Sequence, residues 1–132
     1  MRRFYAQHRT PFRAARARAA VSGLIRDPAW GRVWLIRSGA TDVGYLVLTL
    51  GYSLEFLGHD AFVDELYVLP RHRGKGIGKA AMALLDKECR ALGVNALHLE
   101  VAGGNKTAQG LYRRFGFKKR RYFLMTRAVR RR

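Results

Sequence analysis

The most informative part of the sequence is Val68-Leu69-Pro70-Arg71-His72-Arg73-Gly74-Lys75-Gly76-Ile77-Gly78. An apolar run ends at a proline, three closely spaced glycines follow, and an apolar helical pattern begins directly after them. This order predicts a strand that leads through a glycine-rich turn into a helix. The first amides of a helix have no acceptor within it and carry the positive end of its dipole. The turn is therefore a candidate binding site for a pyrophosphate.

The glycine spacing excludes two common nucleotide-binding loops. Gly74, Gly76 and Gly78 form G-x-G-x-G, which differs from the dinucleotide fingerprint G-x-G-x-x-G. No glycine lies five residues before a Gly-Lys-Ser/Thr, so the turn is not a P-loop either. Taken alone, the stretch could also be a glycine-rich turn with solvated cations.

The sequence after this turn predicts a helix, a strand, a second helix and a last strand. Residues 77–92 carry apolar side chains at helical spacing, and Gly93 closes that helix. A strand over residues 96–101 follows, and the strand–helix–strand unit predicts a right-handed parallel crossover. Asn105 is the expected N-cap of the next helix, which Gly116 ends. Residues 121–128 alternate between apolar and polar side chains well enough to predict the last strand.

The sequence before the turn predicts one helix and an antiparallel meander. Thr10-Pro11 is expected to begin a helix over residues 12–25, which Asp27-Pro28 stops. Three strands follow over residues 33–37, 43–55 and 61–69, joined by links too short for crossovers. Gly51, inside the second strand, suggests a bulge or a bend there. The predicted fold is α+β, a mixed sheet flanked by helices, in a single domain over residues 1–132.

Two motifs together resemble the GNAT N-acetyltransferase superfamily. The pattern Arg71-x-x-Gly74-x-Gly76 after a strand resembles the acetyl-coenzyme A signature of that superfamily. Its second conserved block is similar to residues 99–117, in the same order and at the same spacing. The residues that carry this second resemblance are Leu99, Glu100, Val101, Asn105, Ala108, Leu111, Tyr112, Gly116 and Phe117. The resemblance extends from about Leu24 to the C-terminus.

One departure from the superfamily concerns the N-terminus. GNAT proteins usually begin with a strand and a full first helix, whereas this sequence predicts no first strand. Phe4 and Tyr5 are interpreted as the remnant of the first helix. The resemblance therefore implies a mostly antiparallel GNAT-like sheet whose first strand is missing.

The resemblance implies transfer of an acetyl group from acetyl-coenzyme A (acetyl-CoA) to a primary amine in a direct ternary complex. A bulge in the strand Leu66-Tyr67-Val68 would splay it from the next strand, and Val68 is the candidate for the contact to the thioester carbonyl. The amides of Ile77 and Gly78 would bind the pyrophosphate. The implied cofactor-binding residues are Leu66, Tyr67, Val68, Arg73, Gly74, Lys75, Gly76, Ile77, Gly78, Asn105 and Tyr112.

Catalytic roles follow from the same resemblance. Tyr112 matches the proton donor to the departing sulfur, although a core aromatic side chain would have the same spacing. Asn105 matches a residue that contacts the pantetheine arm, and it can be an N-cap as well. The expected general base is Glu65, because adjacent strand residues face opposite sides and at most one of Asp64 and Glu65 can face the acceptor. Glu55, Asp64 and Glu65 are the candidate substrate-binding residues; the alternative is that each is an exposed carboxylate.

The charge distribution suggests what the acceptor is. The net charge is +17, but residues 38–70 contain no Lys or Arg and hold five acidic residues: Asp42, Glu55, Asp60, Asp64 and Glu65. This acidic middle, expected around the acceptor entrance, favours a cationic amine on a small molecule, peptide or protein. The basic ends are equally well explained as solvated surface or as attraction to polyanions such as nucleic acid or ribosomes.

Composition limits the remaining possibilities. No apolar run is long enough to span a bilayer, and the arginine-rich N-terminus continues into the expected fold, so a cytoplasmic protein without a removed leader is predicted. The single Cys89 is interpreted as a small buried side chain, and no metal site is expected. A homodimer is plausible from the family and the missing edge strand. The rival hypotheses are a non-catalytic acetyl-CoA-binding GNAT domain and a basic nucleic-acid- or ribosome-associated module.

Overall fold

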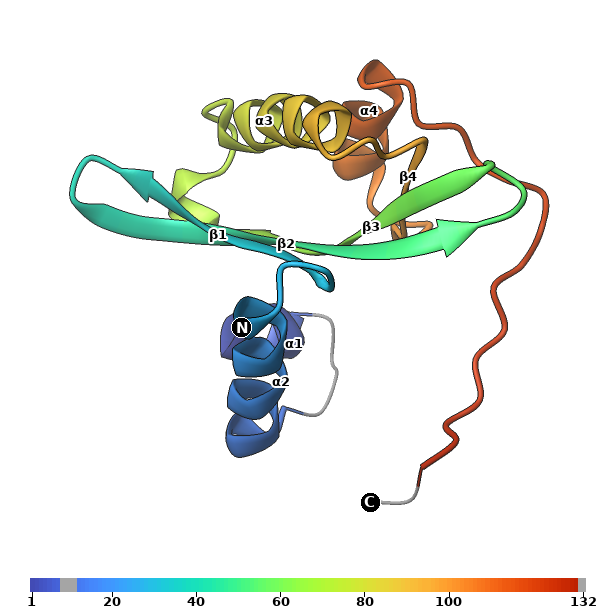
Figure 1. The fold of residues 1–132 in the computed structure, drawn as a ribbon. Helices are drawn as coiled ribbons and strands as arrows, with labels where there is room; N and C mark the ends of the chain where they lie inside the picture. The colour runs from blue at the N-terminus through green and yellow to red at the C-terminus, as the bar shows by residue number, and fades with distance from the viewer. Residues whose placement is uncertain (8–11, 131–132) are drawn as a thin grey trace.

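The computed structural model describes residues 1–7 and 12–130. Its centre is a four-stranded sheet in the order β1-β2-β3-β4 (Figure 1). The first three strands are antiparallel, and β4 is parallel to β3. The mixed, mostly antiparallel sheet that the sequence predicts is confirmed. The strands are β1 (Gly31–Ser38), β2 (Thr41–Ser53), β3 (Gly58–Val68) and β4 (Ala96–Leu99).

Helices lie on both faces of this sheet (Figure 1). One face carries the long helix that follows the glycine-rich turn and the helix that follows β4. The opposite face carries the two helices that precede β1. The helices are α1 (Arg2–Gln7), α2 (Ala14–Arg26), α3 (Ile77–Ala91) and α4 (Lys106–Arg114), and a 3-10 turn spans Pro70–His72.

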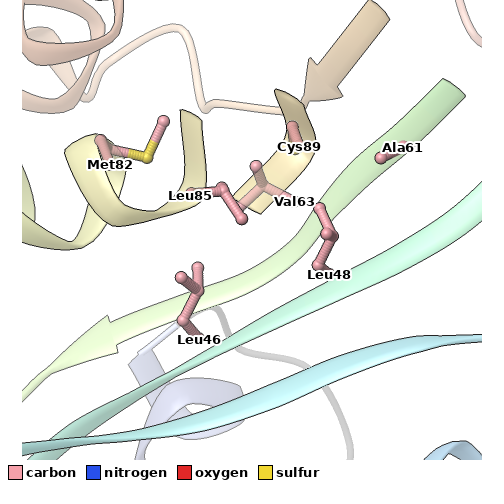
Figure 2. Packing of buried hydrophobic residues seen from close by; sticks show 7 residues of the cluster. All are labelled: Leu46, Leu48, Ala61, Val63, Met82, Leu85 and Cys89. Atoms are coloured by element: carbon pink, nitrogen blue, oxygen red, sulfur yellow. The ribbon is translucent and has the colours of Figure 1, made fainter. Parts of the chain in front are cut away.

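The main core lies between the sheet and α3. Because side chains alternate along a strand, Leu46 and Leu48 of β2 face α3, while Tyr45 and Val47 face α1 on the other side. The middle of β2 is therefore buried on both faces. The α3-side cluster consists of Leu46, Leu48, Ala61, Val63, Met82, Leu85 and Cys89 (Figure 2). The expectation that Cys89 is a buried apolar side chain is confirmed.

The N-terminal helices partly match the prediction. The interpretation of Phe4 and Tyr5 as part of a first helix is confirmed, since both lie in α1. α2 begins at Ala14, two residues later than predicted, and it ends before its C-cap Asp27 as expected. The predicted start signal Thr10-Pro11 lies outside the described residues. Within the described part of the chain, no strand precedes β1.

Two predicted features of the sheet are wrong. Gly51 lies at no bulge, because it pairs regularly with Asp60. In the pairing of β2 with β3 the register shift comes instead between Val47 and Leu48, and it leaves Asp64 of β3 as the extra residue. The last strand expected over residues 121–128 does not form. That segment runs away from the sheet, and its side chains are exposed (Figure 1).

Two further properties concern the described residues as a whole. No helix among them is both long and apolar enough to cross a membrane. No group of three or more histidine, cysteine or acidic side chains in the same part of the chain is arranged to hold a metal ion.

Candidate functional site

β3 separates from β4 at its bulge. The two strands pair from Asp60 opposite Ala96 to Val63 opposite Leu99, and the ladder ends there. Residues 65–68 stay paired with β2 but lie beyond the last pair with β4. The bulge is thus just before the expected Leu66-Tyr67-Val68 stretch, and the splay begins at this point. One edge of β3 is left open beside the glycine-rich turn.

The open edge presents backbone donors. The Leu69 amide donates to the carbonyl oxygen of Val43 (2.8 Å), on the β2 side. Because successive amides along a strand point in opposite directions, the amide of Val68 faces away from β2. An extended ligand that carries amide groups could therefore pair with this edge as an added strand.

The bulge also turns Glu65 onto the face that α1 covers. Val63 packs in the α3-side core, and without the extra residue Asp64 the side chain of Glu65 would point to that same side. Instead Glu65, a residue only 7% exposed, accepts through its carboxylate a hydrogen bond from the Tyr45 hydroxyl (2.6 Å) and one from the Tyr5 hydroxyl (2.9 Å). Tyr5 reaches it from α1, sixty residues away in the sequence.

The two hydroxyls stay protonated and act as donors. Burial, followed by the hydrogen bond and the negative charge of Glu65, raises the pKa of Tyr5 to about 12. The same causes raise the pKa of Tyr45. A carboxylate has about four acceptor positions on its two oxygens, so two tyrosines leave Glu65 able to accept further hydrogen bonds. Sequence reasoning missed the roles of Tyr5 and Tyr45, because no local pattern connects them to Glu65.

The other acidic residues do not gather around Glu65. Asp64 is its neighbour on the bulge, and partial burial raises the pKa of the Asp64 carboxyl. Glu55 lies in the turn between β2 and β3, where its carboxylate pairs with Arg120 (2.6 Å). Two further acidic residues have their own partners: Asp42 pairs with Arg37, and Asp60 with His98. Asp64 and Glu65 are neighbours at the bulge, whereas Glu55, Asp42 and Asp60 lie elsewhere, so the structure does not gather the five acidic residues in one place.

The glycine-rich turn has the backbone that an anion site needs. Gly74 and Gly76 adopt positive φ angles of 75° and 81°, which side chains disfavour. A Cβ on either glycine would meet nothing within 4 Å, so the space beside the turn is open. At the start of α3, the Ala80 amide donates a hydrogen bond to the Gly76 carbonyl oxygen (3.0 Å). The amides of Ile77 and Gly78 precede it and are free of intrahelical acceptors. A pyrophosphate fits this arrangement.

Arg73 turns away from the glycines. Its Nε donates to the Val68 carbonyl oxygen (2.8 Å), and its Nη2 donates to the side chain of Gln7 (2.7 Å) in α1. The guanidinium also lies over the Tyr67 ring, 5.3 Å from its centroid. Arg73 therefore connects the glycine-rich turn to α1, whereas Lys75 is exposed on the turn itself.

The second block lies next to this turn. A Cβ on Gly78 would contact Leu111 of α4 at 3.4 Å, so α4 lies against the start of α3. The Asn105 side chain caps α4 by accepting from the Ala108 amide (3.2 Å), which confirms the N-cap. Gln109, which sequence reasoning missed, donates to the carbonyl oxygens of Ala102 (2.9 Å) and Gly103 (3.0 Å) and so fastens the preceding loop.

Tyr112 follows Leu111 on α4 and is partly buried. Its ring contacts Phe117 edge-on, with centroids 5.9 Å apart, and it packs against the α3-side core. Burial raises the pKa of its hydroxyl, so the group stays protonated at neutral pH. The hydroxyl makes no hydrogen bond to another described residue. Tyr112 is thus a packing residue that keeps a protonated hydroxyl.

Comparisons with known proteins agree with this geometry. The Acetyltransferase (GNAT) family matches residues 2–117. A thialysine N-epsilon-acetyltransferase of Bos taurus is 36% identical over 83 residues, which are 59% of this chain and 45% of that enzyme. The chain spans less than half the length of the first curated relatives it matches.

Solved structures share the fold. An integron cassette protein from the mobile metagenome of Cole Harbour Salt Marsh superposes with a TM-score of 0.86 at 38% identity, covering 98% of this chain and 80% of that one. AAC(6')-Iy, in complex with a bisubstrate analogue of coenzyme A, has a TM-score of 0.76 at 13% identity, covering 89% and 81%. The splayed strand, the glycine-rich turn and the family match over residues 2–117 lead to one conclusion: this chain belongs to the acetyltransferase (GNAT) family.

Proposed function

We propose that this protein transfers an acetyl group from acetyl-CoA directly to a primary amine. The observation that carries the proposal is the Glu65 carboxylate, which two tyrosines hold on the α1-covered face of β3, next to the point where β3 leaves β4. Glu65, the open edge of β3 and the N-terminus of α3 follow one another along the chain. When bound, acetyl-CoA supplies an activated acetyl thioester.

The chain has distinct groups to hold this co-substrate. The amides of Ile77 and Gly78 would bind the pyrophosphate, with Gly74 and Gly76 leaving room for it and Lys75 adding charge. The backbone of residues 66–68 would pair with the pantetheine arm, and the Val68 amide would donate to the thioester oxygen, where negative charge develops. Asn105 and Tyr112 would complete the site from the α4 side.

Glu65 would act as the general base. An alkylammonium has a pKa near ~10.4, so at neutral pH it must lose a proton before it can attack. Glu65 keeps acceptor positions for that proton, or for a water that relays it, while Tyr5 and Tyr45 fix the carboxylate in place. At the other end of the reaction, Tyr112 would donate a proton to the leaving thiolate.

The acceptor is proposed to be a cationic amine on a small molecule or a peptide. Support comes from Asp64 and Glu65, which lie side by side at the bulge. The relative named as a thialysine N-epsilon-acetyltransferase also acts, by its name, on an amine. A panel of amines of both charge types tests this point, and an anionic molecule as the best acceptor would contradict it.

The first experiment is calorimetric titration of acetyl-CoA into the wild type and into Gly76→Glu. The variant places bulk and negative charge in the turn, so we expect the wild type to bind and the variant not to. Gly39→Glu is the matched control: Gly39 also has a positive φ (63°) and open space around its Cβ, but it lies in the β1–β2 turn. The control should bind as the wild type does.

Two results would change the conclusion. A folded wild type that does not bind acetyl-CoA would remove the acetyltransferase proposal. Binding that Gly76→Glu abolishes, without turnover of any amine in the panel, would instead identify a non-catalytic acetyl-CoA-binding domain.

A further inference from the structure

Helix α2 presents a cationic surface that no nearby acidic side chain neutralises. Residues 1–26 contain seven arginines and no Asp or Glu. Arg13, Arg16 and Arg18 are exposed, and none of their guanidinium groups contacts another described residue. The ion pairs between arginines and carboxylates in the described part of the chain lie on β1 and β2, on α3 and at the β2–β3 turn. The charge of α2 is therefore available to a molecule outside the chain.

The positions of these arginines are unfavourable for the helix itself. Arg13 is the N-cap of α2 and makes no side-chain cap, and Arg16 follows in a first turn that holds no acidic residue. The helix dipole opposes cations near its N-terminus, and Arg13 and Arg16 repel each other across one turn. Natural sequences break such local rules mainly where function requires it. An external anion would offset both costs.

One side of α2 packs on the sheet, and the other side is lined with small side chains. Ala17, Val21 and Leu24 are half-buried on one helical face, and Leu24 packs against the apolar cluster on the α1 side of the sheet. The opposite face has an open hollow along it, lined by Ala15, Arg18, Ala19, Ser22, Ile25 and Arg26. Its small side chains let the helix backbone approach a partner closely.

Arg16 and Arg18 leave the helix on opposite flanks of the small residues. They are two positions apart, which is about 200° around an α-helix, and Ala15, Ala19 and Ser22 lie in the outward sector between them. Figure 1 shows α1 and α2 on the face of the sheet opposite α3, away from the glycine-rich turn. The outward surface of α2 thus has a cation on each flank and short side chains between them.

The major groove of double-stranded DNA matches this surface. The groove is about 12 Å wide, which is close to the diameter of an α-helix, and a row of phosphates borders each side of it. Arginine binds phosphate oxygens through paired hydrogen bonds. The major groove of double-stranded RNA is deep and narrow and fits less well. An anionic bilayer also fits less well, because Ile25 is the single large apolar side chain among those that line the hollow.

We propose that α2 binds the major groove of double-stranded DNA. Arg16 and Arg18 would each contact a phosphate on one side of the groove, with the small residues toward the base edges. Phosphate contacts position a protein on the duplex without reading its sequence, so little sequence preference is expected. This function goes beyond acetyl transfer and does not depend on acetyl-CoA.

The test is fluorescence anisotropy of a labelled, mixed-sequence DNA duplex of about 20 base pairs, titrated with the full chain at salt concentrations from about 50 to 200 mM. The logarithm of the affinity should fall linearly with the logarithm of the salt concentration. In Arg16→Gln/Arg18→Gln the slope should be shallower by about two, because each phosphate contact contributes about 0.9. Glutamine is a good helix former, so the circular dichroism spectrum should not change and the melting temperature should not fall.

Lys87→Gln/Arg114→Gln is the matched control. It removes the same charge from exposed positions on α3 and α4, on the other face of the sheet. This variant should keep the wild-type slope. The basic residues after α4 are present in all three proteins, so the comparison isolates the contribution of α2. Hydrogen exchange gives a second readout, since the amides of α2 should exchange more slowly when the duplex is added to the wild type.

Five outcomes would overturn the proposal. They are no binding of the duplex at the lowest salt concentration, tighter binding of single-stranded DNA or of duplex RNA, an equal loss of slope in the control variant, displacement of the duplex by acetyl-CoA, and unchanged hydrogen exchange in α2. Vesicles that contain phosphatidylserine are titrated in parallel. Tighter binding to these vesicles than to the duplex would also contradict the proposal and would assign α2 to a membrane surface.

Discussion

At the scale of single residues, the environment of Glu65 separates it from the other carboxylates of the chain. It is buried with two hydroxyl donors, whereas Glu55 is exposed and paired with an arginine. An amide in place of the carboxylate keeps the shape of the side chain but cannot take up a proton. This difference allows the proposed role of Glu65 as the base to be tested without loss of the fold.

We expect Glu65→Gln to lower kcat/KM for the amine by about 10²–10⁴ near neutral pH, because general base catalysis contributes rate factors of this size. Acetyl-CoA binding should be unchanged in calorimetry. Glu55→Gln is the control, because Glu55 lies in the β2–β3 turn and pairs with Arg120, and it should have a much smaller effect. A Glu65→Gln variant that keeps the wild-type rate and pH profile would exclude Glu65 as the base.

Tyr112 is the second residue whose chemistry can be isolated. Tyr112→Phe keeps the ring contact with Phe117 and removes only the hydroxyl. We expect kcat to fall by about 10²–10⁴, with the KM for acetyl-CoA little changed, because the proton donation occurs in the transition state. Steady-state kinetics with both substrates measures this. A change in melting temperature without a change in kcat would show that the residue serves packing alone.

At the scale of elements, α3 has a sharp division between its two faces. Leu85 is 0% exposed in the cluster of Figure 2, whereas its neighbour Leu84 is 48% exposed. We expect Leu85→Ala to lower the free energy of unfolding by about 2–5 kcal/mol, as for other fully buried leucines. Urea denaturation followed by circular dichroism measures the change. Leu84→Ala, the adjacent control, should stay within about 0.5 kcal/mol of the wild type.

The elements also show where sequence patterns are informative and where they are not. The start of α3 at Ile77, the cap at Asn105 and the stop at Gly116 follow local rules, and the structure agrees with them. The bulge does not follow such a rule. It lies at Asp64 and not at Gly51, because the pairing of two strands fixes where an extra residue can be inserted.

At the scale of the whole molecule, contacts from α1 join it both to β3 and to the glycine-rich turn. Tyr5 donates to Glu65 on β3, and Gln7 accepts from Arg73 beside the glycine-rich turn. These are links between segments about sixty residues apart. A displacement of α1 should therefore alter both the proposed acceptor site at Glu65 and the proposed cofactor site at the glycine-rich turn.

The Tyr5–Glu65 contact predicts a loss of stability at high pH. The pKa of Tyr5 is raised from 10.0 to about 12 in the folded protein, so the unfolded chain releases this proton first. The contribution is complete below pH 10 and is lost as pH rises toward 12. We expect the free energy of unfolding to fall over this range, and to fall less steeply in Tyr5→Phe. Denaturant titrations at both ends of the range measure the slopes, and equal slopes would contradict the prediction.

By itself the sequence determined the family, the order of most elements and the glycine-rich turn, because these depend on residues close together in the chain. The sequence also indicated Glu65 as a candidate base, but not the residues that bind its carboxylate. Only the tertiary structure decided that Tyr5 and Tyr45 hold that carboxylate, that Arg73 turns toward α1, and that Glu55 pairs with Arg120 far from the bulge. It also decided that residues 121–128, which have a strand pattern, form no strand with their own sheet. The physical reason is common to all four: local patterns express backbone preference and burial, whereas side-chain partners and strand pairing depend on which distant segments the folded chain brings together.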